Sequence, residues 1–134
     1  MKKNICIIVA NYYPDISKKL INGAVKVLKS NKIKKHKVIK VPGIFEIPFV
    51  IAKNIRKYDA FIALGCVIKG KTPHFNFISR STINALMKLS VQNKKIIGNG
   101  IITCFNKKQA LDRSSNANNK GSESARAAIS LLKI

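Results

Sequence analysis

The residues best suited to chemistry lie in one short stretch, Gly65–Phe75, which ends in the sequence Thr-Pro-His-Phe. It follows an apolar run, Tyr58–Leu64, that is typical of a buried strand, and a helical pattern begins after it. In an open α/β sheet, ligands bind at the carboxyl ends of strands and against helix N-termini. His74, one of two histidines in the chain, lies here, and an imidazole can both accept and donate a proton near neutral pH. We therefore expect an active site at this strand end, with His74 as its catalytic group.

The same stretch matches the phosphate-loop pattern of nucleoside triphosphatases, G-x-x-x-x-G-K-[ST], from Gly65 to Thr72. Three observations argue against that function. Two β-branched residues, Val67 and Ile68, occupy a loop whose cradle of amides needs small residues. Pro73 keeps Thr72 out of the helical region, whereas a true phosphate loop runs directly into its helix. The last predicted strand also ends without the aspartate that a Mg²⁺ site requires.

Length and composition limit the broad class of the protein. A chain of 134 residues with 46% hydrophobic content suits one domain, residues 1–134, around a single core. No apolar run approaches the roughly 20 residues that span a bilayer, and no signal-peptide pattern is present, so we expect a cytoplasmic protein without a membrane segment. Cys6, Cys66 and Cys104 show no C-x-x-C spacing and are expected to be buried, reduced thiols. The two histidines have no clustered partners, so we expect no metal site.

The formal net charge is +21, from 26 Lys and Arg against 5 Asp and Glu. Such a charge suggests nucleic acid or an anionic surface as a partner. The lysines are dispersed along the sequence, however, with no arginine-rich block, no basic stripe interleaved with aromatic residues and no recognition helix. This pattern favours a solvated basic surface over a nucleic-acid footprint, and that surface would also attract an anionic substrate. A basic nucleic-acid-binding domain is the alternative function, and its binding would weaken steeply with salt.

Hydrophobic periodicity predicts strands that alternate with helices along the whole chain. The strands are expected at Ile5–Ala10, Lys37–Val41, Ala60–Leu64 and Ile96 to about Cys104, the last interrupted at Gly98–Gly100. The helices are expected after Asp15 as a cap, over Phe45–Ala52, through Ser81–Met87 to about Leu89, and over Lys107–Asp112 and Ser122–Leu132. This order implies an α/β fold with a four-stranded parallel sheet, right-handed crossovers and helices on both faces.

Other polar residues near the predicted strand ends suit a phosphorylated and hydroxylated substrate. Lys71 and Thr72 offer a cation and a hydroxyl to a phosphate, and Arg113 could add a bidentate contact, although a surface role is favoured for that residue by itself. Glu46 could bind sugar-like hydroxyls, or it could stabilise the start of a helix through the helix dipole. Tyr12 could stack on a planar ring or simply pack.

Four motifs in the same order make the sequence similar to the lumazine synthase family over nearly its whole length. They are Val41–Pro48, Tyr58–Ala60 leading into Ala63–Gly70, Thr72–Phe75, and Gln109–Arg113 with Asn119–Gly121. The resemblance implies a three-layer α/β/α sandwich of the flavodoxin-like type and a transferase of riboflavin biosynthesis that uses no cofactor. The implied reaction condenses 5-amino-6-(D-ribitylamino)uracil with 3,4-dihydroxy-2-butanone 4-phosphate to 6,7-dimethyl-8-ribityllumazine, and releases phosphate and water.

The resemblance also implies a role for each matched residue. Tyr12 would stack on the pyrimidine ring, Glu46 would hold ribityl hydroxyls, and His74 would shuttle protons. The remaining contacts would come from Gly43, Ile44 and Phe45 lining the pocket, Val67 and Ile68 through their backbone, Lys71, Thr72 and Arg113 on the phosphate, and Asn99 and Lys120 from or towards a neighbouring subunit. The family further implies homopentamers, in some members assembled into icosahedral shells, with active sites between adjacent subunits.

The sequence departs from the family pattern in three places. It begins almost directly at the first core strand, without the N-terminal extension that many members lay against a neighbouring sheet. Tyr12 and Tyr13 stand where a Phe-Asn pair is frequent, which keeps the stacking ring. The loop at 114–119 is about one residue shorter than is common and lacks the usual glycine and lysine, which affects its phosphate and intersubunit contacts.

Overall fold

A computed structural model describes residues 2–134 as alternating strands and helices. The strands are β1 (Asn4–Ala10), β2 (Lys35–Val41), β3 (Ala60–Ile68) and β4 (Ile96–Cys104). The helices are α1 (Pro14–Ser30), the 3₁₀ turn η1 (Ile44–Glu46), α2 (Ile47–Lys53), α3 (His74–Asn93), α4 (Lys107–Arg113) and α5 (Lys120–Leu132). No helix in this described part of the chain is both long and apolar enough to cross a membrane.

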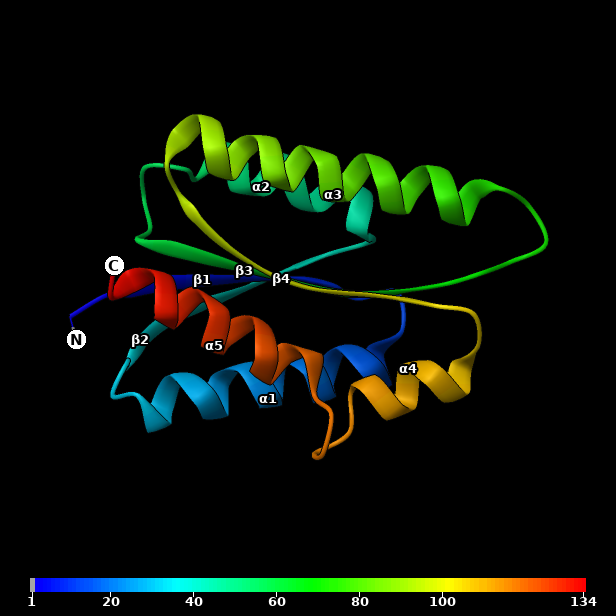
Figure 1. The fold of residues 1–134 in the computed structure, drawn as a ribbon, viewed down its shortest axis with the longest axis horizontal. Coiled ribbons are helices and arrows are strands. Elements are labelled where there is room, and N and C mark those ends of the chain that lie inside the picture. The colour runs from blue at the N-terminus through cyan, green and yellow to red at the C-terminus, as the bar shows by residue number, and fades with distance from the viewer. Residues whose placement is uncertain (1) are drawn as a thin grey trace.

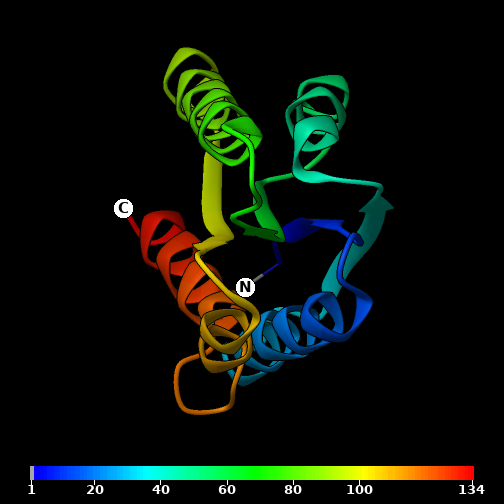
Figure 2. The ribbon, with the colours of Figure 1, turned by 90° about the vertical axis from the view of Figure 1, so that its right-hand side faces the viewer.

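The strands form one parallel sheet in the order β2-β1-β3-β4. Helices α2 and α3 cover one face, and α1, α4 and α5 cover the other (Figures 1 and 2). Each connection returns the chain from the carboxyl end of one strand to the amino end of the next, as parallel pairing requires. The predicted fold class, a three-layer α/β/α sandwich of the flavodoxin-like type with a four-stranded parallel sheet, is confirmed.

Each face of the sheet carries its own hydrophobic core. In β1, Ile5, Ile7 and Val9 pack towards α1 and α5, while Cys6 and Ile8 belong to the core on the side of α2 and α3. All five are fully buried, which explains why this strand is a continuous apolar run rather than an alternating one. The two cores hold the sheet rigid, and the turns at its carboxyl end are therefore fixed in position.

Three glycines that suggested breaks in the sequence lie inside strands. The predicted end of the third strand at Leu64 is wrong, because β3 continues through Gly65 to Ile68. A Cβ atom at Gly65 would lie 2.8 Å from Ile44 Cγ2 and 3.0 Å from Ala10 Cβ, so glycine is needed there for close packing rather than for a turn. The predicted interruption of the fourth strand at Gly98–Gly100 is wrong for the same reason, since β4 is continuous and one of those glycines packs directly under Leu64.

The other boundaries differ from the predictions by a few residues. Asp15 is not the cap of α1, because the helix begins at Pro14 and Asp15 lies in its first turn. The predicted helix Phe45–Ala52 is divided into η1 and α2, with Pro48 in the first turn of α2. Helix α3 begins at His74 itself, so the expected catalytic histidine is the first residue of a long helix.

Candidate active site

A hollow of about 660 Å³ opens at the carboxyl ends of β1, β2 and β3, and we call it the apolar hollow. The turns after these strands and the start of α3 build its walls. Eight residues predicted for the site line it: Tyr12, Gly43, Ile44, Phe45, Glu46, Val67, Ile68 and His74. The fold thus brings most of the predicted ring-binding residues together with the predicted proton carrier.

The turn after β2 is fixed by its own carboxylate. Glu46 Oε1 accepts a hydrogen bond from the Gly43 backbone N–H at 2.9 Å, and the Glu46 N–H donates to the Gly43 carbonyl at 3.3 Å. This reciprocal pair holds the carboxylate at the wall of the hollow, while Phe45, between the two residues, is 67% exposed. The Glu46 carboxylate therefore has a defined orientation before any substrate binds.

Two tyrosine rings stand at the mouth of the hollow. Tyr12 is 71% exposed and meets Tyr13 edge to face, with ring centroids 4.9 Å apart. Lys107 Nζ lies 5.2 Å from the centroid of the Tyr13 ring and 3.0 Å from Asp15 Oδ2. These contacts link the turn after β1 to helix α4, to which Lys107 belongs. Burial is the main cause that raises the pKa of Tyr13, so its hydroxyl is neutral at pH 7. An exposed aromatic ring such as that of Tyr12 is suited to stacking on a planar heterocycle.

His74 is exposed at the N-terminus of α3, directly after the loop at 69–73. Its backbone N–H donates to Thr72 Oγ1 at 3.4 Å, which is a long bond. Lys71 and Thr72 are exposed in that loop and do not line the apolar hollow. Their contacts with a phosphate stay a prediction.

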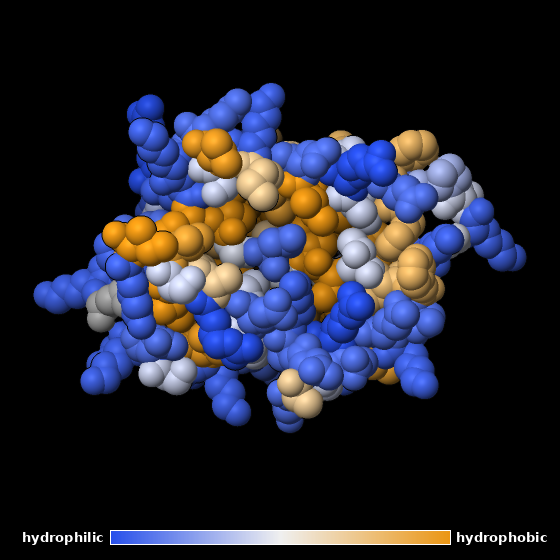
Figure 3. Space-filling model, in the orientation of Figure 1, coloured by the Kyte–Doolittle hydropathy of each residue, from blue (hydrophilic) through white to orange (hydrophobic). Residues whose placement is uncertain are grey.

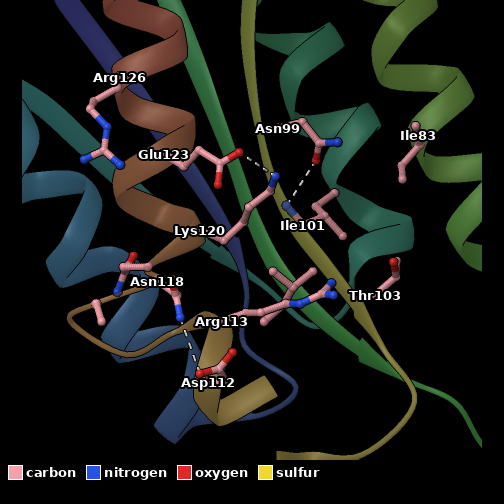
Figure 4. A pocket seen from close by; sticks show the side chains of 13 residues that line it. Ile83, Asn99, Ile101, Thr103, Asp112, Arg113, Asn118, Lys120, Glu123 and Arg126 are labelled. Atoms are coloured by element: carbon pink, nitrogen blue, oxygen red, sulfur yellow. Dashed lines mark hydrogen bonds and ion pairs between the residues drawn. The ribbon is translucent and has the colours of Figure 1, made fainter. Parts of the chain in front are cut away.

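A second hollow, of about 690 Å³, lies beside β4, and we call it the polar hollow (Figure 4). Asn99 on β4, Arg113 at the end of α4 and Lys120 at the start of α5 all line it. Asn99 Oδ1 accepts the Ile101 N–H at 3.0 Å, and Lys120 Nζ pairs with Glu123 at 3.1 Å. Neither ion pair found within residues 2–134 involves Arg113, whose guanidinium is exposed. The polar hollow can thus offer a guanidinium to an anion.

The two hollows share no lining residue. His74 and Arg113, which the sequence assigned to one reaction, therefore line different hollows of the same chain. Each hollow holds only part of the predicted set, and Lys71 and Thr72 lie outside both.

Several lining residues escaped the sequence analysis. Tyr13, Cys66 and Ile78 line the apolar hollow, and Thr103 and Arg126 line the polar one. Tyr13 could have been found from its position next to Tyr12 in the same turn, whereas the others carry no local signal. Among residues 2–134 no group of three or more His, Cys, Asp or Glu side chains could hold a metal ion.

Comparisons with known proteins identify the family of the chain. A family model described as 6,7-dimethyl-8-ribityllumazine synthase matches residues 2–134. The chain is 44% identical to 6,7-dimethyl-8-ribityllumazine synthase 1 of Rhodopseudomonas palustris over 138 residues, which cover 97% of this chain and 84% of that protein. It is 39% identical to the enzyme of that name from Bartonella tribocorum, with 99% and 90% covered, and 40% identical to that of Buchnera aphidicola subsp. Baizongia pistaciae, with 99% and 87% covered.

Proposed function

Since the chain belongs to the 6,7-dimethyl-8-ribityllumazine synthase family, we propose that its active site forms where the apolar hollow of one copy meets the polar hollow of another. The reaction condenses 5-amino-6-(D-ribitylamino)uracil with 3,4-dihydroxy-2-butanone 4-phosphate and releases phosphate and water, as the penultimate step of riboflavin biosynthesis. The observation that carries the proposal is the division of the predicted residues between two hollows that share no wall.

The apolar hollow suits the uracil substrate. In the proposed complex Tyr12 stacks on the pyrimidine ring, while Val67 and Ile68, at the end of β3, present backbone groups to it. Gly43, Ile44 and Phe45 line the pocket, and the oriented carboxylate of Glu46 accepts hydrogen bonds from ribityl hydroxyls. A site with an apolar body and a few placed polar groups is the usual design for a planar, polyhydroxylated ligand.

The phosphorylated substrate needs cations and a proton carrier. We assign the phosphate to Lys71 and Thr72 of one copy and to Arg113 of the next, with Asn99 and Lys120 completing that wall. His74 then accepts and donates the protons that imine formation and phosphate elimination require. Amine attack on a carbonyl followed by loss of phosphate needs orientation, proton transfer and an anion anchor, so the proposed reaction uses neither cofactor nor metal.

A head-to-tail contact between different hollows forms a ring when the rotation between copies closes, and we propose a cytoplasmic homopentamer built from single domains of residues 1–134. The face that bears the polar hollow supports this assembly. Figure 3 shows apolar side chains gathered on the face where β4 lies between α3 and α5. Met87 and Val91, one helical turn apart on α3, are 63% and 68% exposed, and contiguous apolar surface marks an interaction site.

Mixing of two impaired variants tests the proposal. His74→Ala is expected to lower kcat by roughly 10²-fold or less, because orientation supplies much of the rate. Arg113→Ala should chiefly raise KM for the phosphorylated substrate. If the two residues serve one site from different copies, co-assembly restores intact sites at about a quarter of the interfaces, since each contact joins two different surfaces. Absorbance of the lumazine product and release of phosphate are followed together.

The matched control is a second mixture, of His74→Ala with Glu46→Ala. Both residues line the apolar hollow, so no interface in that mixture is intact and activity should not recover. Equal recovery in both mixtures, or recovery in neither, would reject the shared site. Variants with unchanged kinetics would reject the assigned residues themselves.

A further inference from the structure

The fold gathers cations at the end of the sheet opposite the candidate active site. The register places Asn4 beside Lys35, Ile5 beside Ala60, and Ala60 beside Ile96, so the amino ends of all four strands form one row. The start of β1 and the end of α5 lie at this end in Figure 1. The turns that feed the strands and the ends of the helices contribute the basic residues of what we call the cationic end: Lys2, Lys3, Lys29, Lys32, Lys34, Lys35, Lys53, Arg56, Lys57, Lys94, Lys95 and Lys133.

Acidic residues are distributed in the opposite way. Asp59 lies at the cationic end, and its Oδ2 already accepts the Asn4 N–H at 2.7 Å. The other acids of the chain lie outside this end: Asp15 in the first turn of α1, Glu46 in η1, Asp112 in α4 and Glu123 in the first turn of α5. The cationic end therefore holds 12 of the 26 Lys and Arg residues but only one of the five acids, an imbalance that the dispersed spacing of lysines in the sequence conceals.

Helix dipoles explain only part of this arrangement. Lys29 and Lys53 lie in the last turns of α1 and α2, where a cation is stabilised by the partial negative charge of the helix end. Lys2, Lys34 and Lys57 lie outside helices and gain nothing from a dipole. Cations that lie at one end of the molecule without acidic partners repel one another, and this repulsion destabilises the folded state. A bound anion offsets the repulsion.

We propose that the cationic end binds the phosphate backbone of duplex nucleic acid without reading its sequence. Four strands at about 4.8 Å spacing make the row roughly 15 Å wide, and a duplex presents a phosphate charge every 1.7 Å or so along its axis. The width of the row therefore matches several successive phosphates. Tyr58, the aromatic residue at this end, is 7% exposed, so its ring is not available for the stacking that single strands use. The inference does not depend on the proposed active site.

The test measures binding of a fluorescent duplex of about 20 base pairs, of arbitrary sequence, to the full chain at salt concentrations of about 0.05–0.2 M. The variant carries Lys29→Gln, Lys34→Gln, Arg56→Gln and Lys133→Gln. Its matched control carries Lys18→Gln, Lys40→Gln, Arg80→Gln and Lys108→Gln, all exposed and outside the cationic end. Both lose the same charge, and lumazine formation at the wild-type rate shows that each is folded.

The wild type is expected to bind with Kd of about 10⁻⁴–10⁻⁶ M at physiological salt. The variant should bind at least about tenfold more weakly, and the magnitude of its slope of log K against log salt should be smaller by about 3–4. The Kd of the control should change by no more than about twofold. Equal losses in variant and control would overturn the proposal, as would binding to phosphatidylserine vesicles without binding to the duplex. If the fourfold variant does not fold, Lys34→Gln with Lys57→Gln should lower the slope by about 2.

Discussion

At the scale of single residues, the thiol of Cys66 shows how burial controls chemistry at the wall of the apolar hollow. Burial raises the pKa of Cys66 from 9.0 to about 12, and the neighbouring Cys104 thiol adds to the shift. Burial likewise raises the pKa of Cys6 to about 11. These thiols are neutral at pH 7, so Cys66 contributes an apolar surface to the hollow rather than a nucleophile.

The same shift predicts how stability depends on pH. As pH rises past 9, the thiol of the unfolded chain loses its proton, while the buried Cys66 keeps its proton up to a pKa of about 12. The unfolded state then binds fewer protons than the folded state, so the free energy of unfolding falls across this range. Urea unfolding at pH 8 and pH 10 should show a smaller fall for Cys66→Ala than for the wild type. Val67→Ala, a truncation on the same strand without a titrating group, should keep the full fall; equal falls in all three proteins would contradict the assignment.

At the scale of elements, the packing of α1 against α5 depends on Gly121. This residue is buried at the start of α5, and a Cβ atom there would overlap the backbone carbonyl oxygen of Leu20 on α1. Because a backbone atom cannot rotate away, Gly121→Ala must push the two helices apart. We expect it to lower the free energy of unfolding by about 1–3 kcal/mol.

The measurement is urea unfolding, read as a lower midpoint at an unchanged m value. Gly70→Ala is the control, since a Cβ atom at Gly70 would meet no atom within 4 Å, and its effect should stay within about 0.5 kcal/mol. A Gly121→Ala protein as stable as the wild type would show that α5 can shift without cost. It would then argue against a rigid support for Lys120.

Elements also show what the sequence could and could not predict. Strand and helix order was predictable because β1 and β3 are apolar on both faces and the helices have one apolar stripe. The continuation of β3 past Gly65 was not, because the reason for that glycine is contact with Ile44 and Ala10, which are distant in sequence. The site residues were identified through family motifs, yet only the fold shows that His74 and Arg113 line separate hollows. Local sequence patterns predict the secondary structure around a residue, but not which residues distant in sequence contact it in the fold.

At the scale of the whole molecule, the net charge of +21 is hardly balanced by internal pairing. The ion pairs within residues 2–134 are Lys107–Asp15 and Lys120–Glu123, and both are largely exposed. Exposed pairs contribute about 0–1 kcal/mol each, so repulsion among the remaining cations dominates the electrostatics of the folded state.

Salt should therefore stabilise this protein. The Debye length falls from about 30 Å at 0.01 M to about 10 Å at 0.1 M, which screens repulsion across a molecule of this size while leaving short contacts intact. We expect the Tm in KCl to rise by about 4 °C or more between these concentrations, the shift that about 1 kcal/mol produces in a chain of this length.

The variant with four glutamines at the cationic end should have a higher Tm than the wild type at low salt, and its Tm should rise less as salt is added. Its matched control, with the same number of charges removed elsewhere, should lie between it and the wild type, because those charges lie on four separate elements, α1, β2, α3 and α4. A Tm that falls with salt in all three proteins would mean that attraction between opposite charges outweighs repulsion among the cations in the folded state. The cations at the cationic end would then not repel one another strongly enough for a bound anion to stabilise the protein by relieving that repulsion.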